Sequence, residues 1–128
     1  MKKIIVFATL ALFMVSCQES LEDRCAREAK EYTAKNCPAK MDTNIIMDSL
    51  TFEKSTHTLH YYYRLIGIAD KEGALDSIDA KKLLKDMLKN TTSMKTYKDN
   101  GYNFAYTYRS EKDPKKILFE TLLTKEDY

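Results

Sequence analysis

Alternating apolar and polar positions predict strands in two parts of the chain. In residues 58–68 and 102–109 every second residue is apolar or aromatic, as in Leu59-His60-Tyr61-Tyr62-Tyr63 and Phe104-Ala105-Tyr106. This alternation is typical of a strand with one buried face in an antiparallel sheet. The β-rich stretches 43–53 and 117–123 add a partner strand for each. The polar turns 54–57 and 110–114 then close two hairpins.

Two further stretches have the three- and four-residue spacing of an amphipathic helix. The first is capped by Ser20 and ends near Asn36, because Pro38 disfavours helix at Cys37. The second begins at Asp76 or Ser77 and stops at Asn100-Gly101. The order helix, hairpin, helix, hairpin predicts an α+β fold, a four-stranded antiparallel sheet backed by two helices.

The first seventeen residues have a different character. Two lysines precede a short apolar run, Ile4 to Val15, which is too short to span a bilayer and is typical of a secretory signal. Its end, Met14-Val15-Ser16-Cys17, resembles the lipobox of bacterial lipoproteins. The resemblance implies cleavage before Cys17 and lipidation of Cys17. The alternative is an ordinary secretory signal that ends at a cysteine.

This interpretation divides the chain into a lipoprotein signal peptide (1–16), a lipidated tether (17–22) and a single α+β domain (23–128). Cleavage removes Lys2 and Lys3 from the 21 basic side chains, which leaves 19, equal to the 19 acidic ones. With no net positive charge, we expect no nucleic-acid partner. The expected membrane contact is the lipid anchor.

The residues after Cys17 indicate the membrane in which the protein is anchored. Gln18 in place of an aspartate resembles lipoproteins sorted to the outer membrane, and the acidic stretch 19–23 resembles a surface-display signal. The acidic stretch is equally compatible with a solvated start of the first helix. We therefore expect the outer membrane and leave its face, periplasmic or surface, open.

A second resemblance covers about half of the mature chain. Asn36-Cys37-Pro38, Met41-Asp42 and the later Tyr61-Tyr62-Tyr63 resemble small, uncharacterised exported bacterial proteins with a Cys-Pro start and tyrosine-rich strand pairs. This chain departs from the pattern because its asparagine lies directly before Cys-Pro. The resemblance implies the same order of elements and brings no known activity.

The sequence gives little indication of catalysis or of metal binding. The two histidines, His57 and His60, are expected to point to opposite faces, which disfavours a shared metal site. Glycine-rich phosphate loops and the G-x-S-x-G, H-E-x-x-H and C-x-x-C motifs are absent from the sequence. We expect a non-enzymatic protein without a cofactor or metal.

The tyrosines suggest a binding surface. Tyr62 lies between Tyr61 and Tyr63, so it must face away from them, beside His60 and Arg64. Tyrosine and arginine are enriched at binding hot spots, so His60, Tyr62 and Arg64 are the candidate binding surface. The alternative is that tyrosines are common in strands for packing alone, and Ile66 could mean that this face is partly covered.

These observations favour a lipid-anchored accessory protein of the cell envelope that binds a protein or a glycan. The alternative is a periplasmic inhibitor or immunity-type protein that blocks a hydrolase or toxin.

Two covalent features stay open at this stage. A continuous helix would separate Cys25 and Cys37 by about 18 Å, too far for a disulfide, so we expect both to be free. Asp48-Ser49-Leu50 and Asp76-Ser77-Ile78 resemble bacterial O-glycosylation acceptors at Ser49 and Ser77. Asp76-Ser77 is explained equally well as a helix cap.

Overall fold

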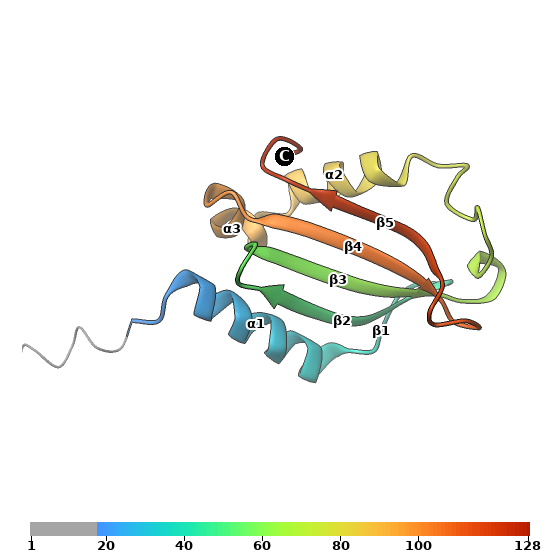
Figure 1. Cartoon of the computed structure of the whole chain (residues 1–128), viewed down its shortest axis with the longest axis horizontal. Helices are drawn as coiled ribbons and strands as arrows, with labels where there is room; N and C mark the ends of the chain where they lie inside the picture. The colour runs from blue at the N-terminus through green and yellow to red at the C-terminus, as the bar shows by residue number, and fades with distance from the viewer. Residues whose placement is uncertain (1–17) are drawn as a thin grey trace, which may run out of the picture.

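The computed structural model describes residues 18–128, so the signal peptide and Cys17 lie outside the described residues. The fold is a five-stranded sheet with helices beside it (Figure 1). The α-helices are α1 (Leu21–Asn36), α2 (Ala80–Asn90) and α3 (Lys95–Asp99), with short 3-10 turns η1 (Gly67–Ala69) and η2 (Thr92–Met94). The strands are β1 (Ala39–Asp42), β2 (Ile45–Glu53), β3 (Thr58–Leu65), β4 (Asn103–Ser110) and β5 (Ile117–Leu123).

The first helix follows its local sequence signals. The side chain of Ser20 accepts a hydrogen bond from the amide of Asp23 at 3.1 Å and so caps α1. The helix stays continuous to Asn36 and ends before the cis Cys37–Pro38 bond. Its start and its end are confirmed. Cys25 and Ala29 are the residues of α1 that are fully buried.

The predicted α+β class is confirmed, but the predicted sheet of four antiparallel strands is wrong in two respects. Residues after Pro38 form an additional strand, β1, which pairs with the start of β2. The strand order is β1-β2-β3-β4-β5, and the central pair β3–β4 is parallel. Two antiparallel units, β1–β3 and β4–β5, are thus joined side by side at that pair.

The second predicted helix is also corrected, because residues 18–128 form three α-helices rather than two. Asp76 and Ser77 lie in a turn, and Asp79 caps α2 by accepting from the amide of Lys82 at 3.1 Å. The helical run breaks at Thr91 and resumes through η2 as α3. Threonine and serine are poor helix formers, which explains the break at Thr91-Thr92-Ser93.

One face of the sheet carries the core. Leu59 and Leu65 of β3 and Phe104 of β4 belong to the same buried cluster as Leu84 and Leu88 of α2 and Cys25 and Ala29 of α1. Tyrosines extend this cluster across the parallel pair: Tyr61 stacks on Tyr106 at 4.9 Å between ring centroids, and Tyr63 on Tyr108 at 4.7 Å. Both helices therefore pack on the face to which these strand residues point.

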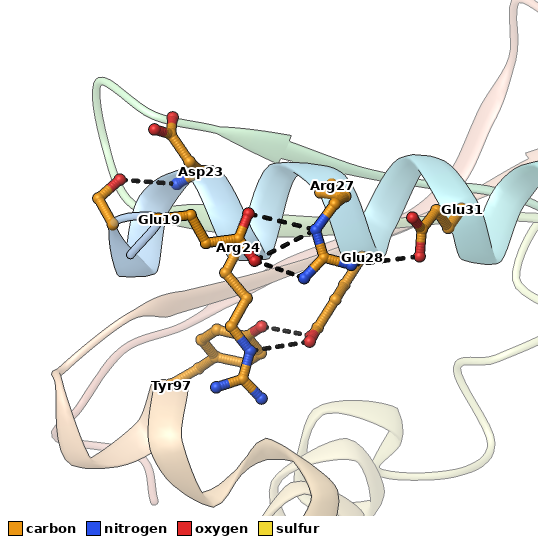
Figure 2. A network of polar contacts seen from close by, with 8 residues as sticks. Glu19, Asp23, Arg24, Arg27, Glu28, Glu31 and Tyr97 are labelled. Atoms are coloured by element: carbon orange, nitrogen blue, oxygen red, sulfur yellow. Dashed lines mark hydrogen bonds and ion pairs between the residues drawn. The ribbon is translucent and has the colours of Figure 1, made fainter. Parts of the chain in front are cut away.

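Polar contacts join α1 to α3 at the edge of this layer (Figure 2). Tyr97 of α3 donates its hydroxyl to Glu28 at 2.5 Å, and Arg24 donates to the same carboxylate at 2.9 Å. The hydrogen bond from Tyr97 is the main reason that the pKa of Glu28 is lowered. The short helix α3 is thereby fixed against α1.

Cys25 and Cys37 are both free thiols, the first buried and the second half-buried. They lie near opposite ends of the continuous helix α1, as expected from its length.

Among the helices of residues 18–128, none has the length and apolar character needed to cross a membrane.

Candidate functional site

The three predicted surface residues lie together on the sheet face opposite the core. His60, Tyr62 and Arg64 alternate along β3 with Tyr61 and Tyr63, which are partly buried and pack against the core. His57 is in the β2–β3 turn instead, where it stacks on Tyr102 at 5.0 Å. Tyr102 belongs to the core cluster, so the two histidines lie on different sides of the sheet.

A row of hydrogen bonds crosses this face from β3 to β5. The Tyr62 hydroxyl lies 3.0 Å from His60 Nδ1, and His60 Nε2 lies 2.7 Å from Thr107 Oγ1. Thr107 Oγ1 donates to Glu120 Oε2 at 3.1 Å. We call Tyr62, His60, Thr107 and Glu120 the polar row.

With a neutral imidazole, the polar row has one self-consistent set of proton positions. Thr107 has a single hydroxyl proton, which it gives to the Glu120 carboxylate, so His60 Nε2 must carry a proton and donate to Thr107. His60 Nδ1 is then unprotonated and accepts from the hydroxyl of Tyr62. The tautomer of the neutral imidazole is therefore set by its two neighbours.

Burial supports the neutral form. Desolvation lowers the pKa of His60, and the nearby charge of Glu120 opposes this shift to a smaller extent. The Tyr62 ring stacks on the imidazole at 4.0 Å between centroids and contributes to that burial. Thr107 is 0% exposed, so its two hydrogen bonds satisfy a polar group that is removed from water.

Arg64 is held by two carboxylates from other segments. Its Nε lies 2.9 Å from one oxygen of Asp48 and 3.2 Å from the other. Its Nη1 lies 3.6 Å from Glu111, which follows β4. The guanidinium is thus fixed in position while about a third of the side chain, 32%, stays exposed.

Apolar side chains border the polar row on β5. Leu122 pairs with Ala105 and Ile117 with Arg109, next to the β4 residues that pair with His60 and Arg64. Leu122 is 48% exposed and Ile117 is 46% exposed. We define the open face as the polar row together with Arg64, Leu122 and Ile117.

The arrangement suits binding better than catalysis. Thr107 is fully buried and both of its hydrogen-bonding roles are used, so its hydroxyl cannot reach a substrate. Within residues 18–128, no three His, Cys, Asp or Glu side chains are placed to hold a metal ion. The open face instead offers aromatic, cationic and aliphatic groups in fixed positions.

The sequence-based prediction missed three residues of this site. Thr107 and Glu120 become neighbours of His60 only through the β3–β4 and β4–β5 registers. Asp48 reaches Arg64 across the β2–β3 pair, beside the register shift between Met47 and Ser49. Alternation identifies residues on one strand, but it carries no information about which strand lies beside which.

The other predicted modification sites fall in different surroundings. Ser49 is half-buried on β2, whereas Ser77 is exposed in the turn before α2. Cys17, the predicted lipidation site, lies outside the described residues.

The sequence model of a domain of unknown function, DUF8479, matches residues 20–119. This match covers α1 to the middle of β5 and includes every residue of the polar row except Glu120. No curated protein matches the chain.

Three solved structures share the fold. A protein from Pseudomonas aeruginosa described as secreted has a TM-score of 0.66 at 16% identity, covering 86% of this chain and 98% of its own. The type II secretion system pilotin AspS from Vibrio cholerae has a TM-score of 0.60 at 15% identity, covering 90% and 98%. The pilotin EpsS of the Vibrio vulnificus type 2 secretion system has a TM-score of 0.57 at 11% identity, covering 84% and 90%.

Proposed function

The chain belongs to the DUF8479 family, and we propose that it is a lipid-anchored accessory protein of the cell envelope that acts by binding another protein there. The observation that carries the proposal is the fold shared with two secretion-system pilotins over most of each chain. The lipobox-like ending at Cys17 supports the anchor and the envelope location. The outer membrane is the proposed membrane.

We propose the open face as the binding surface. Tyrosine and arginine dominate binding hot spots, and Tyr62 and Arg64 lie two residues apart on the same strand. Both are already fixed before a partner arrives, Tyr62 by stacking on His60 and Arg64 by its two carboxylates. A fixed side chain loses less conformational entropy on binding, which favours affinity.

The exposed aliphatic side chains add the apolar part of such a surface. Leu122 and Ile117 on β5 expose nearly half of their area next to the polar row. Protein interfaces combine an apolar centre with a polar rim, and charged residues are depleted at the centre. These groups are better suited to a protein partner than to a glycan, which would require more exposed hydrogen-bonding groups.

The test is cross-linking of the full chain in intact cells, followed by capture and mass spectrometry. Tyr62→Ala and Arg64→Ala should each reduce recovery of the main partner about tenfold, as expected for hot-spot residues. Met87→Ala is the matched control, since Met87 is exposed on α2, away from the open face.

Thermal unfolding of each variant separates binding from folding. If Tyr62→Ala folds and captures the wild-type set of partners, the binding surface lies elsewhere. If the variant fails to fold, Tyr62 is a structural residue and the proposal for this face is wrong. A hydrolase or toxin as the captured partner would instead support the inhibitor alternative.

The anchor has its own test. Cys17→Ala should leave the protein unacylated and shift it from the membrane to the soluble fraction when cells are fractionated. A variant that stays in the membrane at the processed mass of the wild type would exclude lipidation at Cys17.

A further inference from the structure

A hollow lined by lysines lies between α2, α3 and the C-terminal segment. It has a volume of about 650 Å³, and its lining includes Lys89 at the end of α2, Lys95 and Lys98 on α3, and Lys125 after β5. One acidic side chain, Asp99, is also part of the lining. The residues from Cys17 onward carry equal numbers of basic and acidic side chains. The four lysines around the hollow show that these charges are unevenly distributed over the surface.

Two of the four lysines have internal partners and two do not. Lys95 pairs with Asp99 at 2.7 Å, and Lys98 donates to the carbonyl of Leu88 at 2.7 Å. Among the contacts of residues 18–128, Lys89 and Lys125 have no carboxylate within ion-pair distance. Their positive charges remain available for an anion from outside.

The hollow lies at the end of the molecule where the tether begins. Glu22 in the first turn of α1 contacts His57 at 3.3 Å, and His57 stacks on Tyr102. Tyr102 directly follows Gly101, which lines the hollow. Figure 1 shows α3 and the start of α1 at the same end of the sheet.

The part of the tether between Cys17 and α1 is short. Three residues, Gln18 to Ser20, separate Cys17 from the first residue of α1. Three extended residues span at most about 11 Å. An acylated Cys17 would hold this end of the domain, and the hollow with it, close to the lipid headgroups.

Two of the three acidic residues around the start of α1 are paired with cationic side chains of the domain. Glu19 pairs with Arg27 at 2.5 Å, and Asp23 pairs with Lys54 at 2.5 Å. Figure 2 shows the Glu19 carboxylate directed at the Arg27 guanidinium, beside the helix. Within the described part of the chain, Glu22 contacts only the His57 ring, so of these three acids it alone lacks a lysine or arginine partner, against the two unpaired lysines of the hollow.

We propose that the lysine hollow binds the phosphate of an anionic lipid headgroup in the membrane that anchors the chain. The contact would add an electrostatic attachment to the lipid anchor and fix the orientation of the domain on the bilayer. The open face would then be presented at a defined angle to the membrane. This inference rests on the proposed lipidation of Cys17.

The test is lysine footprinting of the full acylated protein in vesicles. Vesicles are made of phosphatidylcholine alone or with 30% phosphatidylglycerol, and acetylation of each lysine is read by mass spectrometry. Lys89 and Lys125 should react several-fold more slowly in the anionic vesicles, because a bound phosphate keeps the amine protonated and shielded. The protection should disappear in 0.5 M NaCl, since salt screens the attraction.

Lys112 and Lys115 in the β4–β5 turn are the internal control and should react equally in both vesicles. Lys95 also lines the hollow and should be protected in the anionic vesicles. This protection should be lost in Lys89→Gln/Lys125→Gln and kept in Lys112→Gln/Lys115→Gln. Equal acetylation of Lys89 in both vesicles would overturn the proposal. Equal protection by 10 mM inorganic phosphate in neutral vesicles would assign the hollow to a free anion instead.

Failure of the anchor is distinguishable from failure of this inference. A protein that lacks acylation does not float with vesicles of either composition, which would contradict the proposed function. A protein that floats with both but shows no difference in lysine reactivity keeps the anchor and contradicts the lipid-binding hollow alone.

Discussion

The hydroxyl of Thr33 on α1 bonds to both backbone groups of Leu50 on β2. It donates to the Leu50 carbonyl at 2.8 Å and accepts from the Leu50 amide at 2.9 Å. β1 pairs only with Ile45 to Met47, so the later part of β2 is a sheet edge. Thr33 therefore occupies the place of a neighbouring strand at one position of that edge.

Replacing Thr33 by valine should lower the free energy of unfolding by about 1–2 kcal/mol. Valine keeps the shape but leaves the amide and the carbonyl of Leu50 without their partner, in a partly buried place. Urea denaturation measures the change. Thr33→Ser keeps the hydroxyl and should cost clearly less; a loss in Thr33→Ser together with a wild-type stability in Thr33→Val would show that the methyl packing matters, not the hydrogen bonds.

Removing the hydroxyl of Tyr97 should also destabilise the fold. Tyr97→Phe breaks the hydrogen bond to Glu28, and we expect a loss of about 1 kcal/mol, at the low end for a charged acceptor because the Glu28 side chain is 41% exposed. This hydrogen bond lowers the pKa of Glu28, so its contribution is present above about pH 4.5 and is lost as the pH falls through the folded-state pKa. Unfolding curves of wild type and variant should therefore converge in acid. A difference that stays constant down to pH 3 would contradict this explanation.

His60 should make the free energy of unfolding depend on pH in a higher range than Glu28 does. The pKa of His60 is lowered in the folded state, so below about pH 6.5 the unfolded chain binds a proton that the folded chain does not. The free energy of unfolding should fall as the pH decreases from 6.5 towards the folded-state pKa. In His60→Gln this slope should be reduced, as measured by urea denaturation between pH 8 and pH 5.5. An unchanged slope would mean that the imidazole is already accessible to protons in the folded protein.

The two thiols should differ in reactivity. Burial raises the pKa of Cys25 to about 12 and also raises that of Cys37, so neither forms much thiolate at neutral pH. Cys25 is 1% exposed and should not be alkylated by iodoacetamide in the folded protein, whereas the half-buried Cys37 should react slowly. Mass spectrometry in and out of denaturant checks this. Two thiols that resist alkylation even in denaturant, until a reductant is added, would reveal a disulfide.

Local signals in the sequence predicted most of the elements, because the physical causes lie within a few residues. Ser20 and Pro38 bound α1 as expected, and alternation places Tyr61 and Tyr63 in the core with Tyr62 on the opposite face. The start of α2 was assigned too early because Asp76, Ser77 and Asp79 are all competent caps. Only the structure distinguishes them, through the bond from the amide of Lys82 to Asp79.

Local sequence signals do not predict how all the strands pair. The prediction of two hairpins is right for β2–β3 and β4–β5, where a short turn dictates an antiparallel pair. The parallel contact of β3 with β4 depends on where the chain returns after residues 66–102, and no local pattern encodes it. His60 was thus placed on the correct face, but its bonding to Thr107, which the polar row depends on, could not be predicted.

The parallel pair also determines the order in which the molecule can assemble. Each antiparallel unit forms through turns of a few residues, but β3 and β4 meet only after the intervening chain, residues 66–102, has closed into a loop. Closing such a loop costs more entropy than closing a hairpin, and contacts of high sequence separation slow folding. The stacked pairs Tyr61–Tyr106 and Tyr63–Tyr108 lie across this junction, so they are among the contacts that hold the two units together once they meet. We expect the rate-limiting event in folding to be the pairing of β3 with β4, which joins the two antiparallel units at the stacked tyrosines.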